Sequence, residues 1–216
     1  MAPPPGDRPL PRGPHQLSRE AVELSQRQRL LQATTEVVAE RGYVKTTVAS
    51  ILARAGVSRA TFYELFSDRE DCFHAAYRAN AELVAEVLAG ELERVRTMGE
   101  PTPLARLDRV LRVYLRVLDD APALARVFLV EVYAAGPAAI GQRRESLERF
   151  VDIVAETHRG ETGLLGTAPE QRFAAQVIVG AVSSLVTNAI GAGDPEPLSA
   201  LHGPLMRLAE QLTDKS

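Results

Sequence analysis

Cysteine, tryptophan and aromatic residues are scarce in this chain. Its 216 residues include one cysteine, Cys72, and no tryptophan, and only 5% of them are aromatic. A lone cysteine cannot form an internal disulfide, and the four scattered histidines lack the spacings typical of metal ligands. The sequence therefore predicts neither a disulfide framework nor a metal site, and a reducing cytoplasm is the location that fits it best.

Long apolar runs and enzyme motifs are missing as well. No apolar stretch of signal-peptide length opens the chain, and nowhere do about 18 uncharged apolar residues run together as a membrane span requires. We find no Gly-rich phosphate loop, no His-Glu-x-x-His pair and no nucleophile elbow. The sequence thus predicts no export, no membrane insertion, no cofactor and no enzymatic activity.

Charge is distributed unevenly along the chain. The formal net charge is −3, to which residues 1–70 contribute +2 and residues 71–216 contribute −5. This acidity argues against general coating of nucleic acid, whereas a mildly basic N-terminal part permits DNA binding without proving it.

Apolar residues at helical spacing occur in nearly every segment from Ser18 onward, and no strand-like alternation stands out. We therefore expect an all-α fold. Residues 1–17 are expected to form a separate disordered tail, because six of the fourteen prolines fall in the first 14 positions. The tail is either simply solvated or a basic arm whose Arg8, Arg12 and Arg19 touch a DNA minor groove.

Capping and breaking residues predict where the helices begin and end. A first helix should start at a capping box of Ser25 and Gln28, after a short turn at 18–24, and end at Gly42. A long fourth helix should begin at Ser67 or Asp68, with Ser67 and Glu70 as its capping box, and end near 98–99. Later helices should be bounded by proline and glycine at Thr102-Pro103, Pro122, Gly136-Pro137, Ala168-Pro169, Gly191 and Pro197.

Two short helices are predicted between Thr46 and Phe66. The first, capped by Thr46 or Thr47, has an apolar stripe and ends at Gly56, which supplies a left-handed residue. Ser58 caps the second helix, which turns Leu65 and either Thr61 or Phe62 inward. The stripe consists of Val48, Ile51, Leu52 and Ala55.

An α-helix fits the DNA major groove, and this second helix can present side chains near its N-terminus to base edges. Arg59 can donate two hydrogen bonds to a guanine, Thr61 can contact a thymine, and Ala60 permits a close approach. The neighbouring donors suit phosphate oxygens. The predicted DNA-binding residues are Lys45, Thr46, Thr47, Ser58, Arg59, Ala60, Thr61, Tyr63 and Arg69. By periodicity alone, however, two such helices are equally compatible with packing inside an ordinary bundle.

The residues around this unit resemble the TetR family of bacterial repressors over about Arg27 to Phe73. The likeness covers Arg27-Gln-Arg-Leu-Leu, Glu40-Arg-Gly-Tyr, the Thr-Thr-Val entry, Ala55-Gly-Val-Ser, Thr61-Phe-Tyr-Glu-Leu-Phe and Ser67-Asp-Arg-Glu-Asp. It implies a three-helix DNA-binding head, joined by a long helix to a C-terminal bundle, with about nine helices in all. We therefore expect a head at 18–70 and an effector-binding and dimerisation domain at 71–216.

The resemblance also assigns roles by position. The equivalents of Thr47, Arg59, Thr61 and Tyr63 face DNA, and the position of Arg69 is usually a lysine near a phosphate. Leu52 replaces a common alanine, and Cys72 replaces a common leucine. Cys72 is expected to pack where head and body meet, with a reactive thiol sensor as the alternative.

The body is predicted less sharply. The segment from Ala174 to Ile190 is apolar almost all round, so it must be covered on every side, by a second subunit or by the rest of its own chain. The dimer interface is predicted at Val177, Ile178, Ala181, Leu185, Leu205 and Leu208. Polar-tipped residues among apolar neighbours commonly line a small-molecule site, although each is also compatible with a place in the core or, for Glu131, on the surface. The effector pocket is predicted at Tyr114, Phe128, Glu131 and Tyr133.

The function expected from these observations is that of a homodimeric repressor. It would bind a pseudo-palindromic double-stranded DNA operator and leave it when a small-molecule effector binds. An enzyme is the first rival, and an all-α adaptor protein without DNA activity is the second.

Overall fold

The computed structural model describes residues 19–99, 102–158, 168–192 and 196–213, and within them all regular secondary structure is helical, as predicted. The predicted tail, residues 1–17, lies outside these residues, whereas Arg19, named with its arginines, is the first residue of α1. The α-helices are α1 (Arg19–Arg41), α2 (Val48–Ala55), α3 (Arg59–Leu65), α4 (Arg69–Met98), α5 (Pro103–Asp120), α6 (Pro122–Leu129), α7 (Pro137–Glu156), α8 (Ala168–Ala192) and α9 (His202–Thr213). Two short 3-10 helices, η1 (Glu131–Ala135) and η2 (Leu198–Leu201), lie between them.

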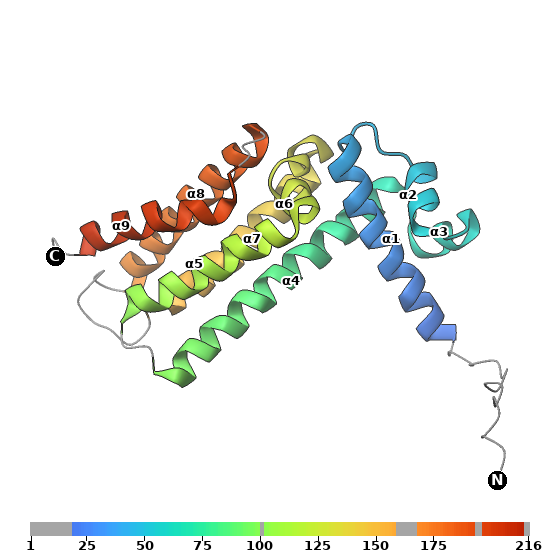
Figure 1. Ribbon diagram of the computed structural model, residues 1–216. Helices are drawn as coiled ribbons and strands as arrows, with labels where there is room; N and C mark the ends of the chain where they lie inside the picture. Colours follow the sequence, from blue (N-terminus) through green and yellow to red (C-terminus); the bar gives the residue numbers. More distant parts are fainter. Residues whose placement is uncertain (1–18, 100–101, 159–167, 193–195, 214–216) are drawn as a thin grey trace, which may run out of the picture.

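The helices form an elongated molecule with a small head at one end (Figure 1). Helices α1, α2 and α3 make the head, and α8 with α9 lies at the far end of the body. Helix α4 connects the two parts, and its 30 residues span about 45 Å. A tilt of α4 would therefore move the head relative to the body.

Local capping explains the short helices of the head. Of the two threonines considered, Thr47 is the N-cap of α2, and it forms a reciprocal capping box with Ser50. Gly56 ends α2 at φ 63°, in the left-handed region that glycine adopts without strain. Ser58 caps α3 by accepting a hydrogen bond from Thr61 N. The predicted turn chemistry is confirmed at each of these positions.

Two predicted capping boxes are wrong, although the start of α4 at Asp68, one of the two positions considered, is confirmed. Helix α1 runs unbroken from Arg19, and Ser25 lies inside it, because no glycine or proline interrupts the sequence ahead of that serine. Helix α4 is capped by Asp68, whose side chain accepts from Asp71 N, so Ser67 and Glu70 do not form a capping box. Both helices do end where glycine was expected to stop them, at Gly42 and Gly99.

Helix α4 takes part in two apolar cores through neighbouring faces. Cys72 and Ala75 pack into the head core, together with residues such as Phe62. Phe73 and Tyr77 belong to the larger core of the body. Because consecutive residues of one helix enter different cores, the head cannot change its angle without disturbing the packing of the first turns of α4.

Helix α8 carries an unusual amount of exposed apolar surface. Phe173, Val177 and Leu185 are 67%, 55% and 43% exposed, and they lie on one stripe at spacings of four and eight residues. By length and composition the stretch Pro169–Ala192 is also able to cross a membrane, which the sequence analysis did not predict. Core helices of other proteins have the same composition, so this is weak evidence for a membrane.

Candidate DNA-binding and effector sites

Helix α3 turns one face into the head core and the other outward. Phe62 is fully buried, whereas Arg59, Ala60 and Tyr63 are exposed. The Arg59 guanidinium carbon lies 5.7 Å from the centre of the Tyr63 ring, so the two side chains lie beside each other on the outer face. This register is the one the sequence predicted, with Phe62 rather than Thr61 as the inward residue.

Hydroxyl groups gather at the starts of α2 and α3. Thr47 and Ser58 are exposed, and each uses its side-chain oxygen to cap a helix. The Ser58 and Thr61 hydroxyls lie 2.9 Å apart. Lys45, also exposed, lies two residues before Thr47. The outer surface of the head thus combines hydroxyl donors with cationic side chains.

Two predicted DNA-binding residues point elsewhere. Thr46 is only 2% exposed and donates a hydrogen bond to Gly42 O, so its side chain is directed into the turn and not toward DNA. Arg69 is half-buried and donates to Tyr43 O and to Thr46 O, at 3.0 and 2.7 Å. Its guanidinium also stacks 4.4 Å above the Tyr43 ring. Arg69 therefore shapes the turn between α1 and α2.

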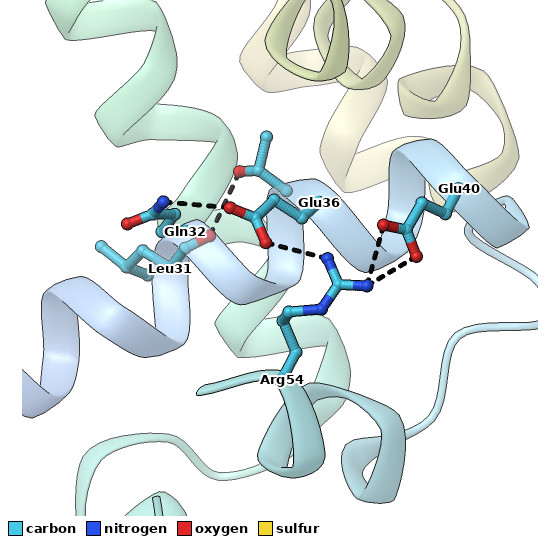
Figure 2. A network of polar contacts seen from close by, with 6 residues as sticks. Leu31, Gln32, Glu36, Glu40 and Arg54 are labelled. Atoms are coloured by element: carbon cyan, nitrogen blue, oxygen red, sulfur yellow. Dashed lines mark hydrogen bonds and ion pairs between the residues drawn. The ribbon is translucent and has the colours of Figure 1, made fainter. Parts of the chain in front are cut away.

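The sequence analysis missed Arg54, which clamps α2 onto α1 (Figure 2). Its guanidinium donates to Glu36 at 2.9 Å and to both carboxylate oxygens of Glu40. Hydrogen bonds from Arg54 and from Gln32 lower the pKa of Glu36. A charged residue on a short amphipathic helix gives no sequence signal of this role, because its partners come from another helix.

A narrow apolar cavity lies in the body between α5, α7 and α8. Its interior amounts to about 50 Å³, or about 490 Å³ if the open solvent at its mouth is counted, and Tyr114 and Ser183 are the residues of its wall that carry hydroxyl groups. Its wall includes Leu107, Phe150, Ile178 and Val182. A wider apolar groove of about 1110 Å³, counting the solvent above it, shares residues of α5 and α8 with the cavity and extends to α9.

Comparison with known proteins relates the head of this chain to a known family. The profile described as "Bacterial regulatory proteins, tetR family" matches residues 30–76, which contain α2, α3 and the turns around them. Over these residues the chain matches the TetR family. It is a transcriptional regulator, and the helix-turn-helix unit is therefore more than bundle packing.

The relatives of this chain include regulators of known role. The fatty acid metabolism regulator of Bacillus subtilis is 24% identical over 181 residues, which are 83% of this chain and 91% of the relative. The transcriptional repressor AcnR of Corynebacterium diphtheriae is 35% identical over 120 residues, and the match covers 46% of this chain and 63% of the AcnR chain. The solved structure of Bacillus subtilis FadR with stearoyl-CoA has a TM-score of 0.63 and 22% identity, and covers 86% of this chain and 97% of that one.

Of the four residues predicted for the effector pocket of this regulator, only Tyr114 lines the cavity. Phe128 is a core residue whose ring stacks on Tyr77 at 5.1 Å. Tyr133 is 52% exposed. Glu131 is buried, but it faces the head, where it accepts a hydrogen bond from Tyr43 N. Residues of η1 and α6 that adjoin in sequence thus point in different directions.

Arg143 of α7 is a buried cation that the sequence analysis missed. It is 5% exposed, and its guanidinium donates to Tyr133 Oη, Phe128 O and Ser183 Oγ, at 2.9, 3.2 and 2.7 Å. A signal was present, because Arg143 follows Ala139 by four residues and precedes Phe150 by seven, on the inward stripe of α7.

The predicted interface residues are divided between surface and core. Val177, Ala181, Leu185 and Leu208 are exposed, whereas Ile178 and Leu205 are half-buried and pack on the body core. Ile178 also lines both the cavity and the groove. Phe173, which the prediction did not include, is exposed as well and lies four residues before Val177 on the same side of α8.

Cys72 is fully buried in the head core, 3.2 Å from the Thr34 hydroxyl. Burial raises the pKa of its thiol to about 11, which disfavours the reactive thiolate. The structure therefore favours the packing role over a thiol sensor.

Proposed function

We propose that this regulator is a cytoplasmic homodimer that represses transcription and leaves its operator when a small-molecule effector binds. The observation that carries this proposal is the pairing of two features. The head presents an exposed polar face on α3, and the body contains an apolar cavity between α5, α7 and α8. We assign residues 18–70 to the DNA-binding head and 71–216 to the effector and dimer domain, with the first turns of α4 shared between them.

DNA binding is assigned to the outer face of the head. Helix α3 enters a major groove, where Arg59 and Thr61 contact base edges. Ser58 and Ala60 lie closest to the groove floor because they begin the helix. Lys45, Thr47 and Tyr63 contact phosphates, which fix the register of the head without selecting a sequence.

Dimerisation is assigned to the exposed apolar stripe of α8 together with Leu208 of α9. Exposed apolar surface of this kind commonly marks a protein interface. Two-fold pairing through it presents two α3 helices to successive major grooves, about 34–36 Å apart along the DNA. A pseudo-palindromic operator follows from that symmetry.

The effector is assigned to the cavity between α5, α7 and α8. The side chains that line it are almost all aliphatic or aromatic, so an extended apolar chain is the ligand that matches its surface. The relative from Bacillus subtilis, solved with stearoyl-CoA, binds a molecule with such a chain. Insertion of a ligand between α5, α7 and α8 would shift α4, which packs on α5, and thereby rotate the head. A coupling of about 1–3 kcal/mol is typical of such responses.

The test is a titration of DNA from the flanking promoters with the full-length protein, at several salt concentrations. Retention of one promoter fragment near physiological salt, lost with added effector, supports the proposal. An adaptor protein or an enzyme would show no sequence-selective retention. A protein that bound only at low salt, and to all fragments equally, would contradict the proposal.

A further inference from the structure

The guanidinium of Arg143 is an unusual buried charge that lies behind the wall of the cavity, in contact with Ser183. All three of its acceptors, the Tyr133 hydroxyl, the Phe128 carbonyl and the Ser183 hydroxyl, are neutral groups. Among the residues that the structure describes, no carboxylate forms an ion pair with it. A buried cation without a counter-charge is costly. The carbonyl dipoles at the C-terminal end of α6, to which Phe128 O belongs, offset only part of that cost.

This cation adjoins the cavity through residues that line it. Ser183, which accepts from Arg143 Nη2 at 2.7 Å, is part of the cavity wall, and so is Tyr114. Burial raises the pKa of Tyr114, and the positive charge of Arg143 acts in the opposite direction. The guanidinium is therefore close enough to the cavity for its charge to act on groups at the wall.

Unused hydrogen-bonding capacity lies in the same region. A guanidinium has five N–H donors, and three hydrogen bonds are formed here. The Tyr77 hydroxyl is fully buried and makes no hydrogen bond of good geometry within the described parts of the chain, although Ser146 and Arg143 lie near enough to lower its pKa. One turn beyond Ser183 on α8, Thr187 Oγ1 is likewise unsatisfied. Buried polar groups are rarely left without partners, so the N–H groups of Arg143 that form no hydrogen bond have capacity for a further acceptor.

We propose that the effector is an amphipathic carboxylic acid, whose carboxylate binds Arg143 and Ser183 and whose apolar chain occupies the cavity between α5, α7 and α8. This inference rests on the proposed function and specifies the chemical class of its ligand. A carboxylate provides the two acceptor oxygens that a guanidinium binds best, and it supplies the absent negative charge. A neutral ester or a thioester supplies no such charge at this position.

The same contacts connect the ligand to the head. Arg143 holds Tyr133 of η1, and η1 begins with Glu131, which is bonded to the backbone of Tyr43. A carboxylate that draws the guanidinium toward the cavity loosens its hold on Tyr133. The displacement is then passed to the turn that precedes α2.

The experiment is calorimetric titration of the full-length protein with three probes that share a ten-carbon chain: decanoate, methyl decanoate and decanoyl-CoA. We expect decanoate to bind roughly tenfold to a hundredfold more tightly than methyl decanoate, because hydrogen bonds to charged groups have that magnitude. Arg143→Gln should remove the preference. Arg144→Gln, which changes an exposed arginine next along the same helix, should retain it.

Two further measurements keep the inference testable if Arg143→Gln fails to fold. The comparison of acid and ester in the unaltered protein needs no variant. Ser183→Ala, a smaller change, should weaken decanoate several-fold and leave the ester unaffected. The inference is overturned if the ester or the CoA thioester binds as tightly as the acid, if no probe binds, or if Arg143→Gln keeps the preference.

A parallel operator-release assay separates this inference from the proposed function. If decanoate binds as expected but leaves operator affinity unchanged, the carboxylate site stands and the ligand-responsive function fails. If decanoyl-CoA alone binds and releases the operator, the function stands and the carboxylate assignment fails.

Discussion

The carboxylate of Glu131 accepts a hydrogen bond from the backbone N–H of Tyr43 at 2.9 Å, and this bond joins the body to the head. Arg126 of α6 pairs with the same carboxylate at 3.2 Å. Gly42, at φ 81°, lets the chain pass close by, since a Cβ atom there would lie 3.4 Å from Glu131. The Arg69 guanidinium in turn stacks on the Tyr43 ring. A movement of η1 therefore reaches the turn before α2 through two contacts.

Replacement of Glu131 should weaken the contact between head and body and lower the stability of the protein. Glu131→Ala leaves the Tyr43 N–H buried without an acceptor, and we expect a loss of about 1–3 kcal/mol in the free energy of unfolding. Glu131→Gln retains an acceptor and should lose less. Denaturant unfolding of both variants checks this. Equal losses for Ala and Gln would show that the hydrogen bond to Tyr43 contributes little.

Arg59 and Lys45 should affect DNA binding in different ways. Arg59→Ala is expected to cost about 1–3 kcal/mol and to relax the base preference at one operator position. Lys45→Ala should weaken binding to all sequences alike and reduce the salt slope by about one. Binding to a panel of single-base operator variants at several salt concentrations distinguishes them. If Arg59→Ala leaves selectivity intact, the assigned register of α3 is wrong.

Arg69 is expected to contribute to the stability of the head rather than to DNA binding alone. Arg69→Ala removes two hydrogen bonds to backbone carbonyls and the stack on Tyr43, so we expect the free energy of unfolding to fall by about 1–3 kcal/mol. Arg69→Lys keeps the charge but cannot reproduce all three contacts, and it should be intermediate. A residue that served only as a phosphate contact would leave stability unchanged in both variants, as measured by denaturant unfolding.

Cys72 should be protected from modification and should make the protein sensitive to alkali. Burial raises the pKa of its thiol from 9.0 to about 11, and burial also raises the pKa of Tyr77, to about 12. A raised folded-state pKa contributes stability that is fully present below the unfolded value and is lost as the pH rises through the folded one. Thermal unfolding should therefore show a loss of stability from about pH 9 upward, with part of it absent in Cys72→Ala. A native thiol that reacted with a disulfide reagent at pH 8 as fast as the unfolded chain would contradict the burial.

The exposed stripe of α8 should be required for self-association. Leu185→Glu places a charge in the proposed interface and should convert the dimer into a monomer, as measured by sedimentation velocity. Leu83→Glu is the matched control, because Leu83 is 51% exposed on α4, away from the stripe. A Leu185→Glu variant that remained dimeric, with the control dimeric as well, would remove α8 from the interface.

Local chemistry explains what the sequence by itself determined. The caps at Thr47 and Ser58, the stop at Gly56 and the outward face of Arg59 follow from hydrogen bonding and helical spacing within a few residues. Those interactions are short-range, so the head and its register could be predicted. The start of α1 was missed because a capping pattern at Ser25 does not begin a helix when nothing breaks the chain before it.

Only the tertiary structure decided which polar groups of the body meet. Glu131 pairs with Tyr43 across 88 positions of the chain, Arg143 reaches Ser183 across 40, and Arg69 reaches Tyr43 O across 26. Whether a charged residue lies on the surface, in the head joint or beside a cavity depends on how distant helices pack, and periodicity along one helix carries no information about its partner. The sequence of this regulator therefore specified the register of its head helices, while the packing of its helices determined which polar groups lie beside the cavity and how the head is held.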